Sequence, residues 1–126
     1  MKPEIEQALA RDLTIDITTI GRRSGRPRRI EIWFHSSGGR YIITGIPGRR
    51  DWYANLVANP YFTFHLKESA KVDLPATAVP VTDPDDRRKL LLGATSIWNK
   101  PNRTNVDKWV RNSPLVEIFL ENPGGA

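Results

Sequence analysis

The sequence contains no cysteine, one methionine and two histidines among its 126 residues. The absence of cysteine excludes disulfide bonds, thiolate nucleophiles and thiolate metal sites. His35 and His65 lie in separate strand-like segments without a nearby acidic cluster, so we predict no metal site. Neither histidine lies in a recognisable nucleophile motif with a serine, and the sequence identifies no catalytic side chain.

Long apolar runs are also absent. No stretch approaches the roughly 20 apolar residues that a membrane-spanning helix requires, and the N-terminus lacks the apolar region of a signal peptide. A cytoplasmic protein is therefore expected. Neither a linker nor a repeat divides the chain, so we expect one domain over residues 1–126, with an N-terminal helix within 1–12 and a frayed tail at 122–126.

Positive charge, by contrast, is in excess. Nineteen lysines and arginines against fourteen acids give a formal net charge of +5 and an isoelectric point near 9.9. This balance favours an anionic partner, and a nucleic acid, an anionic membrane surface and a phosphorylated small molecule all satisfy it. Composition alone leaves the three open.

Five arginines occupy one nine-residue stretch. Residues 21–29 read Gly-Arg-Arg-Ser-Gly-Arg-Pro-Arg-Arg and connect two strand-like segments. Glycines let backbone N–H groups turn toward an anion, Ser24 adds a hydroxyl, and guanidinium groups match phosphate or carboxylate oxygens in pairs. The spacing is neither a Walker loop nor a dinucleotide-binding fingerprint. We interpret this loop as an anion site in preference to a solvated basic hairpin.

Alternation of apolar and polar residues predicts about six strands. In chain order they are expected over residues 13–20, 30–35, 40–44, 61–67, 72–82 and 115–120. Gly38 and Gly39 are expected to form the turn between the strands over residues 30–35 and 40–44. Pro75 and Pro80 each lack a ladder donor and place their strand at an edge, a bulge or a barrel corner.

Helices are predicted around these strands, over residues 3–11, 51–58 and 84–97, with a further turn or two over 105–110. Asp51 is expected to cap its helix. Asp83 is expected to cap the next helix, and the carboxylates of Asp85 and Asp86 are expected to interact favourably with the positive N-terminal end of its dipole. These acids are therefore interpreted as structural and not as catalytic carboxylates. With no strand–helix rhythm, the fold class is mainly β with flanking helices (α+β), a small antiparallel barrel.

Two segments, in order, carry a family resemblance. Residues 18–28, Thr-Thr-Ile-Gly-Arg-Arg-Ser-Gly-Arg-Pro-Arg, and residues 52–60, Trp-Tyr-Ala-Asn-Leu-Val-Ala-Asn-Pro, resemble the Thr-Thr-x-Gly-Arg-Lys-Ser-Gly-x-x-Arg and Trp-Tyr-x-Asn-Leu-x-Ala-Asn-Pro stretches of the deazaflavin-dependent nitroreductase and quinone reductase family. The resemblance is good over residues 13–66 and elsewhere rests on length and on the terminal strand.

The resemblance implies a split β-barrel like that of FMN-binding oxidoreductases. It implies the deazaflavin coenzyme F420, which carries a lactyl phosphate and an oligoglutamate tail, and hydride transfer to a nitroaromatic, quinone or activated alkene. The residues assigned to the cofactor are Arg22, Arg23, Ser24, Gly25, Arg28, Thr44, Gly45, Arg49, Arg50 and Trp52. Arg26 and Arg29 are expected to be bystanders. Tyr53 and Trp98 are assigned to the acceptor.

The chain also departs from the family pattern. Glu31-Ile32 stand where the family commonly has Pro-Leu in the strand lining the cofactor, and a carboxylate near the ring is unexpected. The loop over residues 45–50 is short and lacks the usual lysine, for which Arg49 or Arg50 substitutes. Trp98 and Trp109 lie in a segment that does not align, and for Trp98 core packing and a place at the rim of the site are both open.

Two alternatives to the F420 hypothesis remain. The same barrel and arginine loop would bind FMN, because a nucleotide phosphate needs the same donors. A non-catalytic nucleic-acid-binding barrel would use Tyr61, Phe62 and Phe64 for base stacking and is less favoured, because the arginines gather in one loop. A homodimer, and a contact of the basic face with a membrane surface, are undecided by the sequence.

Overall fold

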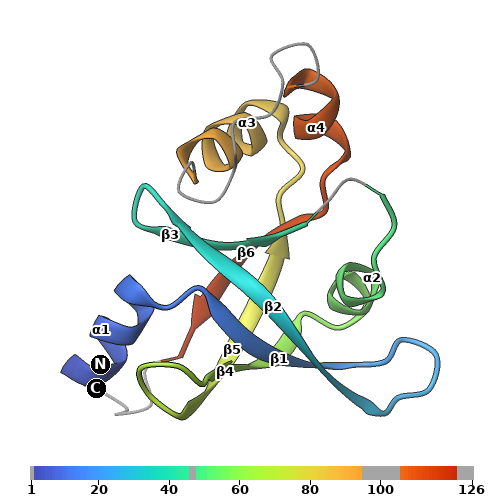
Figure 1. Ribbon diagram of the computed structural model, residues 1–126. Coiled ribbons are helices and arrows are strands. Elements are labelled where there is room, and N and C mark those ends of the chain that lie inside the picture. The colour runs from blue at the N-terminus through green and yellow to red at the C-terminus, as the bar shows by residue number, and fades with distance from the viewer. Residues whose placement is uncertain (1, 46–47, 95–105, 122–126) are drawn as a thin grey trace.

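The computed structural model describes residues 2–45, 48–94 and 106–121. In that part of the chain, six strands form a closed antiparallel barrel with the neighbour order β1-β2-β3-β6-β5-β4 (Figure 1). The strands are β1 (Thr14–Ile20), β2 (Pro27–Ser37), β3 (Arg40–Thr44), β4 (Tyr61–Leu66), β5 (Val72–Pro80) and β6 (Leu115–Leu120). The predicted mainly β fold with flanking helices is confirmed.

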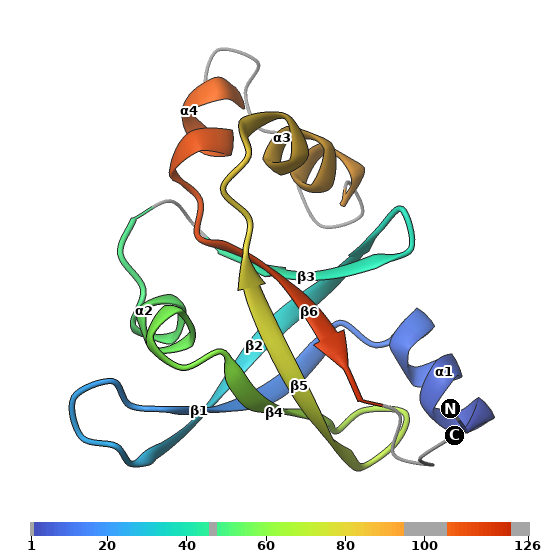
Figure 2. The same ribbon diagram turned by 180° about the vertical axis from the view of Figure 1, so that it is seen from behind.

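Four helices lie around the barrel in the described ranges. They are α1 (Pro3–Arg11), α2 (Asp51–Ala58), α3 (Pro84–Gly93) and α4 (Val106–Asn112). Figures 1 and 2 show α3 and α4 together at one end of the barrel, and α2 on the side toward which the β1–β2 hairpin projects. None of these helices has the length and apolar character needed to cross a membrane.

Alternate residues of the strands fill the barrel interior. Ile15, Ile17, Phe34, Phe64 and Leu74 are each at most 2% exposed. The rings of Phe34 and Phe64 meet edge to face, with centroids 5.1 Å apart and planes at 83°, an arrangement that the ring quadrupoles favour. Each such side chain contributes about 1.5–3 kcal/mol by burial, so this interior holds the strands that carry the site.

A second apolar cluster anchors the helical end. Leu90 and Leu91 of α3 and Val110 of α4 pack with Ile42 of β3. Trp109, left open by the sequence, is buried in the same cluster at 8% exposure. The helices α3 and α4 are therefore fixed to the barrel, and the segment that follows α4 is held in place.

The starts of α2 and α3 differ in how far they match the prediction. Asp83 caps α3 as expected, with its Oδ2 accepting from the N–H of Asp86 at 2.9 Å. The predicted cap at Asp51 is wrong: the N-cap is Arg50, and Asp51 lies in the first turn of α2. The Asp51 carboxylate instead faces a neighbouring loop, described below.

The end of α3 comes earlier than residue 97. The helix ends at Gly93, and Ala94 leaves helical geometry with φ −88° and ψ 41°. Gly93 lies so close to β2 that a Cβ there would stand 2.3 Å from Oγ of Ser37, and that hydroxyl donates to the carbonyl of Leu90 at 2.9 Å. Glycine also favours helix termination. Residues 95–97 lie outside the described residues.

The prolines of β5 do not mark a sheet edge. β5 pairs with β4 on one side and β6 on the other, so of the three alternatives the edge is excluded. The carbonyl of Pro75 accepts from the N–H of Glu121 at 2.9 Å. A residue's N–H and C=O point to the same neighbour in a strand, so the donor that Pro75 lacks is directed at the end of β6. Pro80 is the last residue of β5.

The hairpin between β1 and β2 is tighter than predicted. β2 starts at Pro27, paired with Ile20, so Arg28 and Arg29 belong to the strand and only residues 21–26 form the connection. The N–H of Gly21 donates to the carbonyl of Arg26 at 2.9 Å, and Gly25 has φ 69°, which a glycine adopts without strain. Strand pairing therefore extends into the arginine-rich stretch.

Candidate functional site

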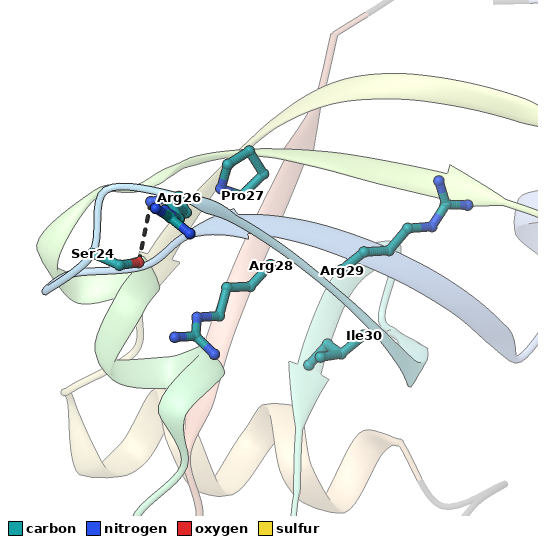
Figure 3. Close-up of a pocket in the computed structure, with 6 residues that line it drawn as sticks. All are labelled: Ser24, Arg26, Pro27, Arg28, Arg29 and Ile30. Atoms are coloured by element: carbon teal, nitrogen blue, oxygen red, sulfur yellow. Dashed lines mark hydrogen bonds between the residues drawn. The ribbon is translucent and has the colours of Figure 1, made fainter.

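The β1–β2 hairpin has two chemically different faces. Arg28 pairs with the buried Thr19, and Arg29 pairs with Thr18. Because successive side chains alternate, Arg28 lies on the face of Phe34 and the barrel interior, and Arg29 lies on the opposite face. We call these the inner and the outer face of the hairpin. Figure 3 shows Arg28 and Ile30 pointing to one side of β2 and Arg29 to the other.

On the outer face, the charges are paired. Asp16 accepts from Lys67 Nζ at 2.7 Å and from Arg29 Nε at 2.9 Å, and Lys67 also pairs with Glu31. These partners, Lys67 first, lower the pKa of Asp16, and Asp16 and Glu31 raise the pKa of Lys67. Glu31 therefore lies on the outer face, on the opposite side of β2 from Arg28.

On the inner face, Arg28 and Ser24 pack against Gly21. A Cβ at Gly21 would stand 2.6 Å from Ser24 Oγ and 3.3 Å from Arg28 Nε, so the close approach requires glycine. Ser24 Oγ accepts from the N–H of Arg26 at 3.2 Å, the dashed line in Figure 3. Within the part of the chain that the structure describes, neither Arg23 nor Arg28 has an ion pair. Arg23 and Arg28 are thus cations without an acidic partner among the described residues, whereas Arg22 lies near Asp51.

The helix α2 holds the other side of this tip. Asn55 Oδ1 accepts from the backbone N–H of Arg22 at 3.1 Å and from its Nη1 at 2.9 Å. Asp51 Oδ1 lies 3.3 Å from Arg22 Nη2. Asn55 and Asp51 are one helical turn apart and therefore share a face of α2. The two sequence motifs meet at these contacts.

Three concave spaces surround the hairpin tip. A cavity of about 150 Å³ between the tip and α2 is lined by Gly21, Arg22, Arg23, Ser24, Arg28, Asp51 and Asn55. A hollow of about 660 Å³ shares Ser24 and Arg28 with it, continues along β2 to Ile30, and includes Arg26 and Arg29 in its lining. A cleft of about 1040 Å³ shares Arg22, Arg23 and Asp51 with it and extends toward the end of α4. The small cavity therefore lies between the hollow and the cleft and shares lining residues with both.

The larger cleft is strongly cationic. The charged residues that line it in the described ranges are Arg22, Arg23, Arg49, Arg50, Asp51, Arg87 and Arg111. Opposed guanidinium groups in a concave site raise the positive potential and attract anions. The cleft thus suits a ligand with several negative charges.

Arg87 of α3 lines the larger cleft and links α3 to the end of α4. It is 9% exposed and donates to the carbonyls of Val81 at 2.7 Å, Val110 at 2.9 Å and Ser113 at 2.5 Å. Burial lowers the pKa of Arg87. Its partners include the last carbonyls of α4, which carry partial negative charge. Arg87 therefore fixes the wall of the cleft that holds Arg111.

The structure brings together part of the predicted site. Arg22, Arg23, Ser24 and Arg28 line the small cavity, and Arg49, Arg50 and Tyr53 line the adjoining cleft. Their roles toward a cofactor or an acceptor stay predictions.

Four predicted residues lie apart from these cavities. Gly25 supplies the positive φ of the turn. Thr44 is buried, and its hydroxyl donates to the carbonyl of Pro114 at 2.7 Å. Gly45 follows it, with the Trp52 ring 3.9 Å from its Cβ position. Trp52 itself packs in the core at 9% exposure. Trp98 lies outside the described residues.

The histidines have the structural surroundings expected of strand residues. His65 lies 2.7 Å from Thr18 Oγ1 through Nε2 and 2.7 Å from Asp73 Oδ1 through Nδ1. Burial lowers the pKa of His35 to about 4, so it is neutral at physiological pH. In residues 2–45, 48–94 and 106–121, no group of three or more acidic or histidine side chains forms a metal-binding cluster.

Sequence reasoning missed Asn55, Arg87 and Arg111. Asn55 stands in the second motif one turn after Asp51, and that spacing was a usable signal. Arg87 precedes Leu90 and Leu91 by three and four residues, which places it on the buried face of α3. Arg111 carried no signal, because its approach to the hairpin tip depends on packing between distant elements.

Comparison with known proteins gives one family and a common fold. The model of a family described as F420H(2)-dependent quinone reductase matches residues 4–118. A conserved hypothetical protein from Mycobacterium tuberculosis is similar with a TM-score of 0.72 and 18% identity, over 97% of this chain and 82% of that chain. A structure named F420 reductase gives 0.63 and 20%, over 93% of each chain. A FAD-binding protein from Mesorhizobium loti gives 0.68 and 12%, over 97% and 91%. These likenesses confirm the split-barrel fold.

Proposed function

The chain belongs to the F420H(2)-dependent quinone reductase family, as its two motifs predict, and on this premise we propose that it transfers a hydride from reduced F420 to a quinone, a nitroaromatic or an activated alkene. The cofactor of the family is reduced F420. We propose that the protein acts in the cytoplasm as one domain over residues 1–126 on a small-molecule acceptor.

The donors of the hairpin tip fit the anionic part of this coenzyme. Arg23 and Arg28 have no acidic partner in the described ranges, and with Arg22 and Ser24 they line one small polar cavity. This observation carries the proposal, because unpaired guanidinium groups bind phosphate and carboxylate oxygens well. The adjoining cationic cleft offers further donors for an anionic tail.

The surface beside this cavity suits a planar ring. On the inner face of the hairpin, Ile30 is 37% exposed and Ile32 is half-buried. In the proposal, this apolar strip binds the deazaflavin, and Tyr53 in the adjoining cleft contacts the acceptor. Trp52 is packed in the core, so its predicted contact with the ring would involve little of its surface.

The bound coenzyme supplies a hydride. The chain's own residues bind the coenzyme, orient the acceptor and exclude water from the reacting atoms. The proton that completes the reduction comes from solvent or from the hydroxyl of Tyr53, which lines the cleft. No side chain is assigned as an obligatory acid or base.

Two other functions have weaker support. FMN binding would use the same arginines, and the fold is shared with a FAD-binding protein. Base stacking by Tyr61, Phe62 and Phe64 has little support, because Phe62 and Phe64 are only 6% and 0% exposed and point into the core.

Titration of the purified protein with F420, FMN and a single-stranded oligonucleotide tests the proposal. F420 is expected to bind at least about tenfold more tightly than FMN, since only its tail adds anionic contacts, each contributing about 1.5–3 kcal/mol. Tighter binding of FMN or of the oligonucleotide would reject the proposal. Turnover of F420H2 with a quinone and with a nitroaromatic then ranks the acceptors.

A further inference from the structure

The side-chain oxygen of Asn55, in the second motif, accepts hydrogen bonds from Arg22 in the first motif. It is 3% exposed, and its Oδ1 accepts two hydrogen bonds from Arg22, one from the backbone N–H at 3.1 Å and one from Nη1 at 2.9 Å. Its Nδ2 donates to Thr19 Oγ1 at 3.5 Å. A single buried amide therefore binds both the end of β1 and the first arginine of the hairpin tip.

The arginines of the tip have different surroundings. Arg22 is held by Asn55 and lies 3.3 Å from Asp51. Arg23 and Arg28 line the same cavity without an acidic partner in the described ranges. Arg22 thus donates from its backbone N–H and from two guanidinium nitrogens to α2, whereas the guanidinium groups of Arg23 and Arg28 have no acidic partner among the described residues and can donate to a ligand.

We propose that Asn55 is a positioning residue of the cofactor site. It fixes Arg22, and through Arg22 the whole hairpin tip, against α2, so that Arg23 and Arg28 are oriented before the anion arrives. Pre-ordering lowers the entropy cost of binding. The inference rests on the proposed function, because it names what the small cavity needs in order to bind the coenzyme.

A purely structural role for Asn55 predicts a different result. A buried amide that only satisfies Arg22 and Thr19 would change stability when it is removed, without changing ligand affinity. Thr19 provides the matched control, because it is 2% exposed and bonds to the other side of the Asn55 amide. Replacing Thr19 disturbs the same buried contact and leaves the bonds to Arg22 in place.

The test compares Asn55→Ala, Asn55→Asp and Thr19→Val in the full chain. Fluorescence titration gives the Kd for F420, and amide hydrogen exchange without ligand reports on the N–H of Arg22. Asn55→Ala is expected to raise the Kd about threefold to tenfold and to speed that exchange. Asn55→Asp retains the acceptor and keeps the exchange slow. Thr19→Val lowers Tm and leaves the Kd within about twofold, since it removes no contact of Arg22.

A double-mutant cycle completes the design. In an Arg22→Ala background, Asn55→Ala is expected to cause a smaller further loss of affinity than it causes in the wild type, because the bond from Nη1 is already gone and only the bond from the backbone N–H at position 22 remains. Additive losses, an unchanged Kd in Asn55→Ala, or an equal rise in Thr19→Val would each overturn the inference. Failure of the wild type to bind F420 would reject the proposed function instead, and the exchange of the Arg22 N–H would still decide whether Asn55 holds the hairpin.

Discussion

The inner and outer faces of the β1–β2 hairpin carry similar residues in opposite situations. On the outer face, Arg29 and Lys67 are paired with Asp16. On the inner face, Arg28 lies beside Ser24 and Gly21 without an acidic partner in the described ranges. Paired cations are already satisfied by the protein, and unpaired cations in a cavity are available to a ligand. The comparison therefore separates charge that the protein itself neutralises from charge that is available to a ligand within one hairpin.

Removing one arginine from each face is the strongest test of this comparison. Arg28→Ala is expected to raise the Kd for F420 about tenfold to a hundredfold, because a hydrogen bond to a charged group contributes about 1.5–3 kcal/mol. Fluorescence titration measures the Kd. The control Arg29→Ala removes the same charge from the outer face and leaves the Kd within about threefold, since exposed charges are screened. Equal effects of the two substitutions would refute the assignment of faces.

Alanine substitutions at Gly21 and at Gly38 separate an effect on the inner face of the hairpin from an effect on backbone strain alone. In Gly21→Ala the new Cβ would meet Ser24 Oγ and Arg28 Nε, so we expect Arg28 to shift and the Kd for F420 to rise about threefold to tenfold. Gly38, at the other hairpin, has φ 57° and nothing within 4 Å of its Cβ position. Gly38→Ala should lose about 1–2 kcal/mol of stability through backbone strain and keep its affinity. Titration and urea unfolding separate the two effects, and a loss of affinity in Gly38→Ala would contradict the expectation.

The outer face gives the smallest expected effect, on the pH dependence of stability. The pKa of folded Asp16 is below its ordinary value because Lys67 and Arg29 bind its carboxylate. Its contribution to stability is therefore present above the unfolded pKa of about 3.9 and is lost as the pH falls through the folded pKa. In Asp16→Asn the urea midpoint should fall less steeply between about pH 5 and 2, with the Kd for F420 at neutral pH unchanged. An acid dependence equal to that of the wild type would show that the pair contributes nothing.

Much of the fold follows from local signals. The β-strand alternation predicts β1, β3 and β6 to within a residue, and α2 ends at Ala58, directly before Asn59-Pro60, as expected. The start of β2 was placed too late, because the prediction treated Arg28 and Arg29 as loop residues. Their pairing with Thr19 and Thr18 depends on the register of the hairpin and not on their own β-propensity. The end of α3 was placed too late, because its contact with Ser37 is long-range.

The candidate site also has a part that the sequence predicts and a part that depends on tertiary packing. The arginine loop and the second motif are visible as sequence stretches, and they predict an anionic cofactor at Arg22, Arg23 and Arg28. The spacing of Asp51 and Asn55 places both on one face of α2, but the contact of Asn55 with Arg22, 33 positions away, is not visible in either stretch alone. The wall formed by Arg87 and Arg111 depends on how α3 and α4 pack on the barrel end.

The sequence by itself determined the family, the barrel and the positive charge near the first hairpin, because strand alternation, turn glycines and arginine clustering are local properties. Only the tertiary structure decided which arginines have an acidic partner among the described residues and which do not. Alternation puts Arg28 and Arg29 on opposite faces, but burial of Phe34 decides which face is the inner one. Free and satisfied cations differ by their neighbours, and the neighbours Asp16, Lys67 and Asn55 come from elements that only folding brings to the hairpin.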